Sequence, residues 1–170
     1  MKTVPPAFRD RFHTHDSIWT DCYVGYNIEQ HSGHASTKEF ALAWLQEHDV
    51  VDVFGVEGAG PARLRIDNRT LREVDEAEAI HIAQTMLNQA MTYGSSARLP
   101  AAELQQLGQL FLSEFEAPLI FSNLYLSSDS SGTHIGSWDQ VVAGYGYSLE
   151  AFLCCIDRRQ IGFLFSIENE

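Results

Sequence analysis

Two histidines and an aspartate near the start of the sequence have the residue types and spacing of a metal site. They lie in the stretch FHTHDSIW, where His13 and His15 are followed directly by Asp16. On a strand, the two histidines would point to the same face. A third ligand would then complete a trigonal or tetrahedral site, and the candidates for it are Asp16, His31 and His34. One hypothesis is therefore a small metal-dependent enzyme that uses the His13/His15 pair.

The rest of a metal motif is missing around these histidines. The HxH pattern resembles the metal motif of the amidohydrolase family, but that motif belongs to a barrel of about 250 residues, and this chain has 170. The stretch HSGH is not followed by the paired cysteines of a zinc finger and lacks the glutamate of an HExxH helix. Surface histidines with local hydrogen bonds explain the pattern better, so we predict no metal and no other cofactor.

Other reactive residue types also fall short of a catalytic set. The stretch SSDSSGTH is typical of a mobile polar loop, whereas a catalytic nucleophile needs a fixed oxyanion hole. The stretch GAGP lacks the further residues of a phosphate-binding loop and indicates a turn. Cys154 and Cys155 lie inside an apolar run, where burial raises a thiol's pKa and makes it inert. We therefore predict that the protein is not an enzyme.

Three helices are predicted from apolar residues at helical spacing and from capping signals. Ser36 and Glu39 have the spacing of a capping box. A second helix has acidic residues in its first turn and Gly94 at its end, and a third begins at Pro100. The predicted helices start at residue 36, cover residues 75–94 and cover residues 100–114.

Strands are predicted where β-branched and aromatic residues gather between turn signals. They cover residues 18–28, 50–57, 62–67, 118–126, 149–156 and 161–167. The second and third of these are expected to pair as one hairpin and the last two as another, with a polar loop at residues 127–136. This order predicts one α+β domain over residues 1–170, with a mostly antiparallel sheet packed with two or three helices.

The charge is strongly acidic and unevenly distributed. The chain has 11 Lys and Arg against 23 Asp and Glu, a formal net charge of −12, while residues 61–100 are neutral. Such a surface repels nucleic acids and anionic membranes and attracts a basic macromolecule. The arginines of RLRIDNRTLR could bind an anion, but we expect them to form ion pairs with nearby carboxylates, namely Asp67, Glu73 and Asp75.

The sequence also indicates the compartment. It has no stretch of about 20 apolar residues that could cross a bilayer, and MKTVPPAFRDRF has charges and prolines where a signal peptide would be apolar. The cysteines number three, and two of them are neighbours in the sequence, which is poor geometry for a disulfide. We therefore expect a cytoplasmic protein with reduced thiols.

In size, acidity and α+β composition the chain resembles the small acidic immunity proteins of bacterial polymorphic-toxin systems. The ending RRQIGFLFSIENE is similar to the terminal strand and acidic tail of such proteins. The resemblance implies an inhibitor that binds and neutralises a basic cognate toxin, for example a nuclease, without chemistry of its own. The residues expected to contact the toxin are Glu47, Asp49, Asp52, Glu57, Asp129, Trp138 and Asp139, with Tyr145 as a further aromatic candidate.

The acidity also fits a third function, a nucleic-acid mimic that blocks DNA-binding enzymes. A mimic would inhibit many DNA-binding proteins, whereas an immunity protein protects against one toxin family. The gene neighbourhood separates the immunity hypothesis from the others, because a toxin gene directly upstream would support it. Elemental analysis of protein purified without chelators tests the metal-dependent enzyme.

Overall fold

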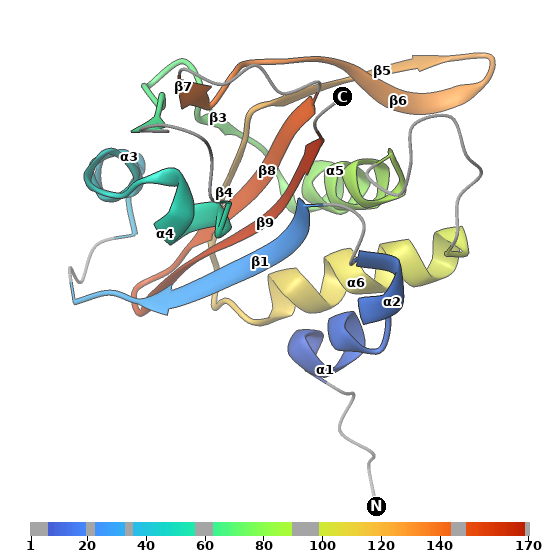
Figure 1. The fold of residues 1–170 in the computed structure, drawn as a ribbon, viewed down its shortest axis with the longest axis horizontal. Helices are drawn as coiled ribbons and strands as arrows, with labels where there is room; N and C mark the ends of the chain where they lie inside the picture. Colours follow the sequence, from blue (N-terminus) through green and yellow to red (C-terminus); the bar gives the residue numbers. More distant parts are fainter. Residues whose placement is uncertain are drawn as a thin grey trace, which may run out of the picture.

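A five-stranded antiparallel sheet forms the centre of the protein in the computed structural model (Figure 1). The structure describes residues 7–19, 23–32, 36–56, 63–89, 99–143 and 149–168. The strand order is β1-β9-β8-β4-β3, and all neighbouring strands are antiparallel. The strands are β1 (Tyr23–Gln30), β3 (Arg72–Glu73), β4 (Leu119–Ser122), β8 (Leu149–Ile156) and β9 (Gln160–Glu168). The predicted α+β class with a mostly antiparallel sheet is confirmed.

The two central strands form the predicted terminal hairpin. Ile156 pairs with Ile161, and every residue of β8 is buried, as are residues 161–167 of β9. Strands covered on both faces have continuous apolar runs instead of an alternating pattern. The turn between them is held by Asp157, which accepts hydrogen bonds from the backbone N–H groups of Arg159 and Gln160 at 2.8 and 2.9 Å.

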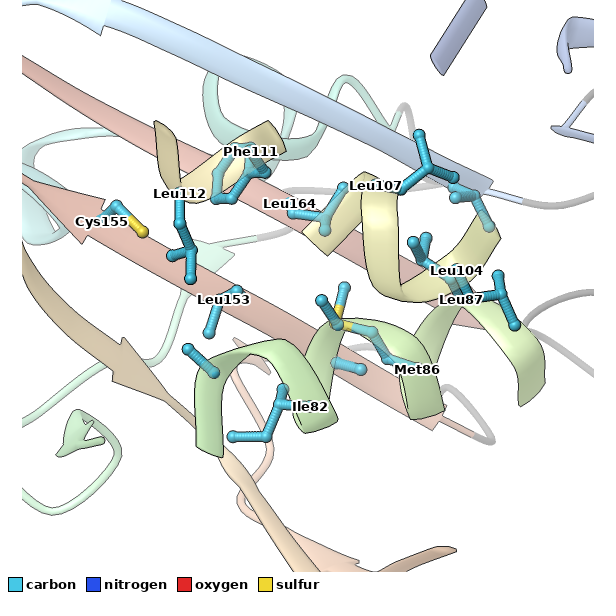
Figure 2. Close-up of a cluster of buried hydrophobic side chains, with 14 of the residues drawn as sticks. Ile82, Met86, Leu87, Leu104, Leu107, Phe111, Leu112, Leu153, Cys155 and Leu164 are labelled. Atoms are coloured by element: carbon cyan, nitrogen blue, oxygen red, sulfur yellow. The ribbon is translucent and has the colours of Figure 1, made fainter. Parts of the chain in front are cut away.

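Helices cover both faces of the sheet. On one face lie α5 (Glu76–Gln89) and α6 (Ala101–Ser113), which pack side chains such as Met86 and Phe111 against Leu153 and Leu164 of the sheet (Figure 2). Gly108 allows the two helices to approach closely, because a Cβ there would lie 3.1 Å from that of Ala83. On the other face α3 (Lys38–Glu47) and α4 (Val50–Phe54) pack against Phe152 and Phe163.

Short elements complete the fold. Near α6 and β1 lie α1 (Phe8–His13) and α2 (Asp16–Trp19). Strand β2 (Arg63–Leu64) pairs with β7 (Val142–Ala143), and β5 (Leu124–Asp129) forms a hairpin with β6 (Gly132–Trp138). No helix in the described ranges is long and apolar enough to span a membrane.

Asn123 marks the point where the chain leaves the central sheet between β4 and β5. Its side chain is buried and makes three hydrogen bonds to backbone groups. The amide nitrogen donates to the carbonyl oxygens of Asp139 and Glu150 at 3.0 and 2.6 Å, and the amide oxygen accepts from the N–H of Phe152 at 3.0 Å. The Asn123 side chain therefore binds backbone groups at the point where the strand-to-strand hydrogen bonds of β4 end.

The predicted strand at residues 50–57 is wrong, because residues 50–54 form α4. Asp49 caps the start of this helix by accepting a hydrogen bond from the N–H of Asp52 at 2.9 Å. Gly55 ends it in the left-handed conformation, with φ of 67°, which a residue without a Cβ adopts without strain. The expected hairpin with residues 62–67 is therefore absent, and β2 pairs with β7 instead.

Three smaller expectations are also corrected. The strand expected from residue 18 begins at Tyr23, because residues 16–19 are helical. Thr37, not Ser36, caps α3 by accepting from the N–H of Phe40, while the Ser36 hydroxyl donates to the carbonyl of Ile156. The expected loop at residues 127–136 is the paired end of the β5–β6 hairpin. The predicted helices at 75–94 and 100–114 are present as α5 and α6, and residues 90–94 lie outside the described ranges.

Candidate partner-binding surface

The FHTHDSIW stretch lies in α1, α2 and the turn between them, so its histidines are not on a strand. His13 contacts Asp16 through Nδ1 and the hydroxyl of Tyr26 through Nε2, each at 2.9 Å. His15 instead contacts Glu103 of α6 through Nε2 at 2.9 Å. The two side chains therefore belong to separate hydrogen-bond networks and do not share a site.

His31 does not join them. The Nε2 of His31 contacts the carbonyl of Asp157 at 2.7 Å, and His34 lies outside the described residues. Within the described ranges, no three His, Cys, Asp or Glu side chains are grouped as a metal site requires. The structure thus supplies local hydrogen-bond partners for the histidines whose spacing suggested metal binding.

Glu103 fixes α1 and the following turn to α6. Its carboxylate accepts two hydrogen bonds from the Arg11 guanidinium, both at 2.6 Å, in addition to the His15 contact. Hydrogen bonding to Arg11 outweighs the opposing effect of burial and, with His15, lowers the pKa of Glu103 to about 2. The FHTHDSIW region is held in place by this ionised carboxylate.

Replacing Glu103 with glutamine should lower the free energy of unfolding at pH 7 by about 1–2 kcal/mol, because the charge-assisted bonds are lost. The folded pKa of about 2 lies below the usual 4.5. The stabilisation is therefore present above about pH 4.5 and lost as the pH falls towards 2. Denaturant unfolding of both proteins between pH 7 and pH 2.5 checks this, and an energy difference independent of pH would contradict it.

An aromatic depression lies beside the start of β1. Phe12 and Trp19 are stacked with ring centroids 5.0 Å apart, and Tyr26 contacts Phe12 edge-on at 5.2 Å. The depression has a volume of about 550 Å³ and includes His13 and Asp16. We call it the aromatic hollow and define it by all its lining residues: Phe12, His13, Asp16, Trp19, Val24, Gly25 and Tyr26.

Acidic side chains gather on the opposite face of β1, around α4. Glu47, Asp49 and Asp52 are exposed, and next to them Val51 leaves 46% of its surface exposed. The backbone of Asp52 is tied to β1, because its carbonyl accepts from the amide of Asn27 at 2.8 Å. The same Asn27 amide lies 3.3 Å from the carboxylate of Glu29. We call this set the acidic α4 surface: Glu29, Glu47, Asp49, Val51 and Asp52.

These carboxylates form no ion pairs with lysine or arginine within the described part of the chain. In the described ranges the carboxylates of Glu29, Glu47, Asp49 and Asp52 form no ion pair with a lysine or arginine side chain. The backbone of Arg63 does form an antiparallel bridge with that of Asp49. The ion pairs that do form with arginine are elsewhere, at Arg11–Glu103 and Arg72–Glu78. Sequence reasoning identified Glu47, Asp49 and Asp52 but missed Glu29 and Val51. Val51 is a neighbour of Asp52 in α4, whereas Glu29 joins the set only through the packing of α4 on β1.

Asp49 has a structural task as well as a charge. Asp49→Ala should lower the free energy of unfolding by about 1 kcal/mol, because the first turn of α4 loses its cap. Asp49→Asn should change stability far less, since asparagine caps helices as well as aspartate does. Urea unfolding of both variants measures the difference, and equal losses would show that the cap does not stabilise α4.

Asp129, Trp138 and Asp139, which were also predicted to contact the partner, are not part of this surface. Asp129 lies near the tip of the β5–β6 hairpin, where hydrogen bonds from the Ser131 hydroxyl and backbone lower its pKa. Asp139 accepts from the hydroxyl of Tyr125 at 2.9 Å, and Trp138 is half-buried against the core. Figure 1 shows this hairpin on the side of the sheet away from β1. Glu57 and Tyr145 lie outside the described residues.

The arginine-rich segment is paired differently from the expectation. Arg72 binds Glu78 at 2.9 Å and also donates to the carbonyl of Leu124. Asp67 instead accepts from the N–H groups of Arg69 and Thr70, and Asp75 accepts from the N–H of Glu78. Asp67 thus stabilises a turn and Asp75 the start of α5, because backbone N–H groups close to them in the sequence donate to their carboxylates.

The cysteines behave as predicted from their apolar surroundings. Cys154 and Cys155 are fully buried in β8, and burial raises the pKa of both thiols. Because the thiolate is the reactive form, neither side chain has the chemistry of a nucleophile.

Comparison with known proteins finds no relative of this chain. No family model matches the chain, and no curated protein or solved structure matches it. The function is therefore argued from the geometry of the residues described above.

Proposed function

We propose that this protein is a cytoplasmic inhibitor that binds a basic protein through the acidic α4 surface, and that its partner is a cognate toxin domain such as a nuclease. The observation that carries the proposal is a set of carboxylates without ion pairs to lysine or arginine in the described ranges, around the exposed Val51. Glu47, Asp49 and Asp52 are exposed and Glu29 is partly exposed. Toxin binding further draws on the resemblance in size and acidity to immunity proteins.

The arrangement suits binding more than chemistry. Unpaired exposed carboxylates attract a basic partner over a distance of about 10 Å at 0.1 M salt and speed its arrival. An exposed aliphatic side chain among them supplies apolar area that becomes buried on contact. No cofactor or substrate needs to be held for such a task.

The test uses the protein encoded directly upstream of this chain's gene. That protein is expressed in bacteria alone and together with this chain, and growth is measured. The expected result is growth arrest by the upstream protein alone, rescue by this chain, and a purified complex of the two.

An upstream protein that is harmless, or a toxin that is neither bound nor inhibited, would overturn the proposal. Inhibition of several unrelated DNA-binding enzymes would instead identify a nucleic-acid mimic, because a mimic acts on many DNA-binding proteins.

A further inference from the structure

The sheet has one long edge and one short edge. In the described part of the chain β9 is the only strand beside β1, which is eight residues long, whereas β3 at the other edge has two. Residues 161–167 of β9 are buried, but residues 25–29 of β1 are all partly exposed. Backbone N–H and C=O groups along an outer strand can pair with another chain.

β1 has few of the features that protect edge strands. Its sequence, YVGYNIEQ, has no proline and no lysine, and its register with β9 runs without a bulge from Tyr23 to Gln30. Proteins usually interrupt an exposed edge by one of these means. A long regular edge is therefore a candidate surface for strand addition.

The two faces beside this edge differ in chemistry. Asn27 and Glu29 are on the face that carries the acidic α4 surface, because Asn27 reaches the backbone of Asp52. Val24 and Tyr26 are on the other face and line the aromatic hollow. A strand added to β1 would send alternate side chains to these two faces.

We propose that β1 binds an extended segment of the partner as a sixth strand, in which basic side chains alternate with apolar ones. The basic side chains contact Glu29 and the α4 carboxylates, and the apolar ones cover the aromatic hollow. This inference rests on the proposed function and specifies how the basic partner docks.

A second copy of the chain fits the same edge poorly. β1 contains no lysine, arginine or histidine, so a copy paired with it would place Glu29 and the α4 carboxylates near like charges. Like charges that face each other across strands destabilise a sheet. The occupant is therefore a basic segment of another protein.

The probe is a capped ten-residue peptide in which lysine and valine alternate, titrated into ¹⁵N-labelled protein. Two controls have the same composition: a block peptide of five lysines followed by five valines, and the alternating peptide methylated at its backbone nitrogens. We expect the alternating peptide to shift the amide signals of residues 23–30 and slow their hydrogen exchange. Both controls should bind at least tenfold more weakly, because they lack the alternation or the donors for strand pairing.

Protein variants locate the contact. Glu29→Gln should weaken binding of the alternating peptide by at least threefold while keeping a side-chain oxygen for the Asn27 amide, and Glu73→Gln on the opposite edge strand should not change it. Equal binding of the methylated peptide, signal shifts confined to α3 and α4, or self-association through β1 in sedimentation experiments would each overturn strand addition.

The same measurements separate this inference from the proposed function. If the upstream protein is bound and inhibited while the β1 amides exchange as before, docking at β1 is wrong and the inhibitor proposal stands. If the peptide adds to β1 but the upstream protein is neither bound nor inhibited, the inhibitor proposal fails and β1 remains a strand-binding edge.

Discussion

The triple variant Glu47→Gln, Asp49→Asn, Asp52→Asn is expected to associate with the basic partner at least tenfold more slowly than the natural protein. These three carboxylates are exposed and have no cationic partner in the part of the chain that the structure describes. Their field therefore acts on an approaching protein and determines the association rate more than the dissociation rate. Asparagine at position 49 keeps the cap of α4, so the fold should be unaffected.

The measurement is stopped-flow association with the purified upstream protein at 0.1 M and 1 M salt. The Debye length falls from about 10 Å to about 3 Å over this range. The association rate of the natural protein should therefore fall markedly, and that of the triple variant much less. The matched control is Glu73→Gln, Glu76→Gln, Glu116→Gln, which changes the net charge equally at exposed positions away from α4. Equal slowing in both triple variants would show that total charge, not the acidic α4 surface, steers the partner.

Asn123→Asp is expected to destabilise the protein by about 3 kcal/mol or more at pH 7. An ionised aspartate cannot donate to the carbonyls of Asp139 and Glu150, which Asn123 now satisfies. The variant would also place a charge in a buried position without a cationic partner in the described structure. The folded pKa of this aspartate would be raised, so the loss of stability should diminish as the pH falls.

Urea unfolding at pH 7 and pH 5 measures this effect. Asn88→Asp makes the same chemical change at an exposed position of α5, where surface substitutions usually alter stability by less than about 0.5 kcal/mol. Similar losses in both variants would show that the Asn123 hydrogen bonds do not hold β5 to the sheet.

The elements that were predicted correctly have strong local signals. The apolar runs of β8 and β9 flank a turn, and α6 combines Pro100 with Leu104, Leu107 and Phe111 at helical spacing. Both are confirmed. The strand predicted at 50–57 is wrong because the prediction gave more weight to the β-branched residues than to two helix signals. These signals, the cap residue Asp49 and the helix-ending Gly55, are both visible in the sequence.

The candidate site was predictable only in part. Glu47, Asp49 and Asp52 are close in sequence, so their common surface follows from local structure. Glu29 and Tyr26 of β1 lie close to α4 and to Phe12 through contacts between segments distant in the sequence, and no local pattern indicates such contacts. Asp129, Trp138 and Asp139 were grouped with the acidic residues because no local pattern indicates that Asp129 and Trp138 lie on a separate hairpin, with Asp139 directly after it.

The strand order has a consequence for synthesis on the ribosome. The two central strands, β8 and β9, follow every other described element in the sequence, and β1 pairs only with β9 among the described strands. Translation proceeds at about 5–20 residues per second. For several seconds, therefore, the partner strands are missing for β1 and for the inner faces of α3, α5 and α6. Nascent chains should therefore depend on chaperones that cover apolar surface until β9 leaves the exit tunnel.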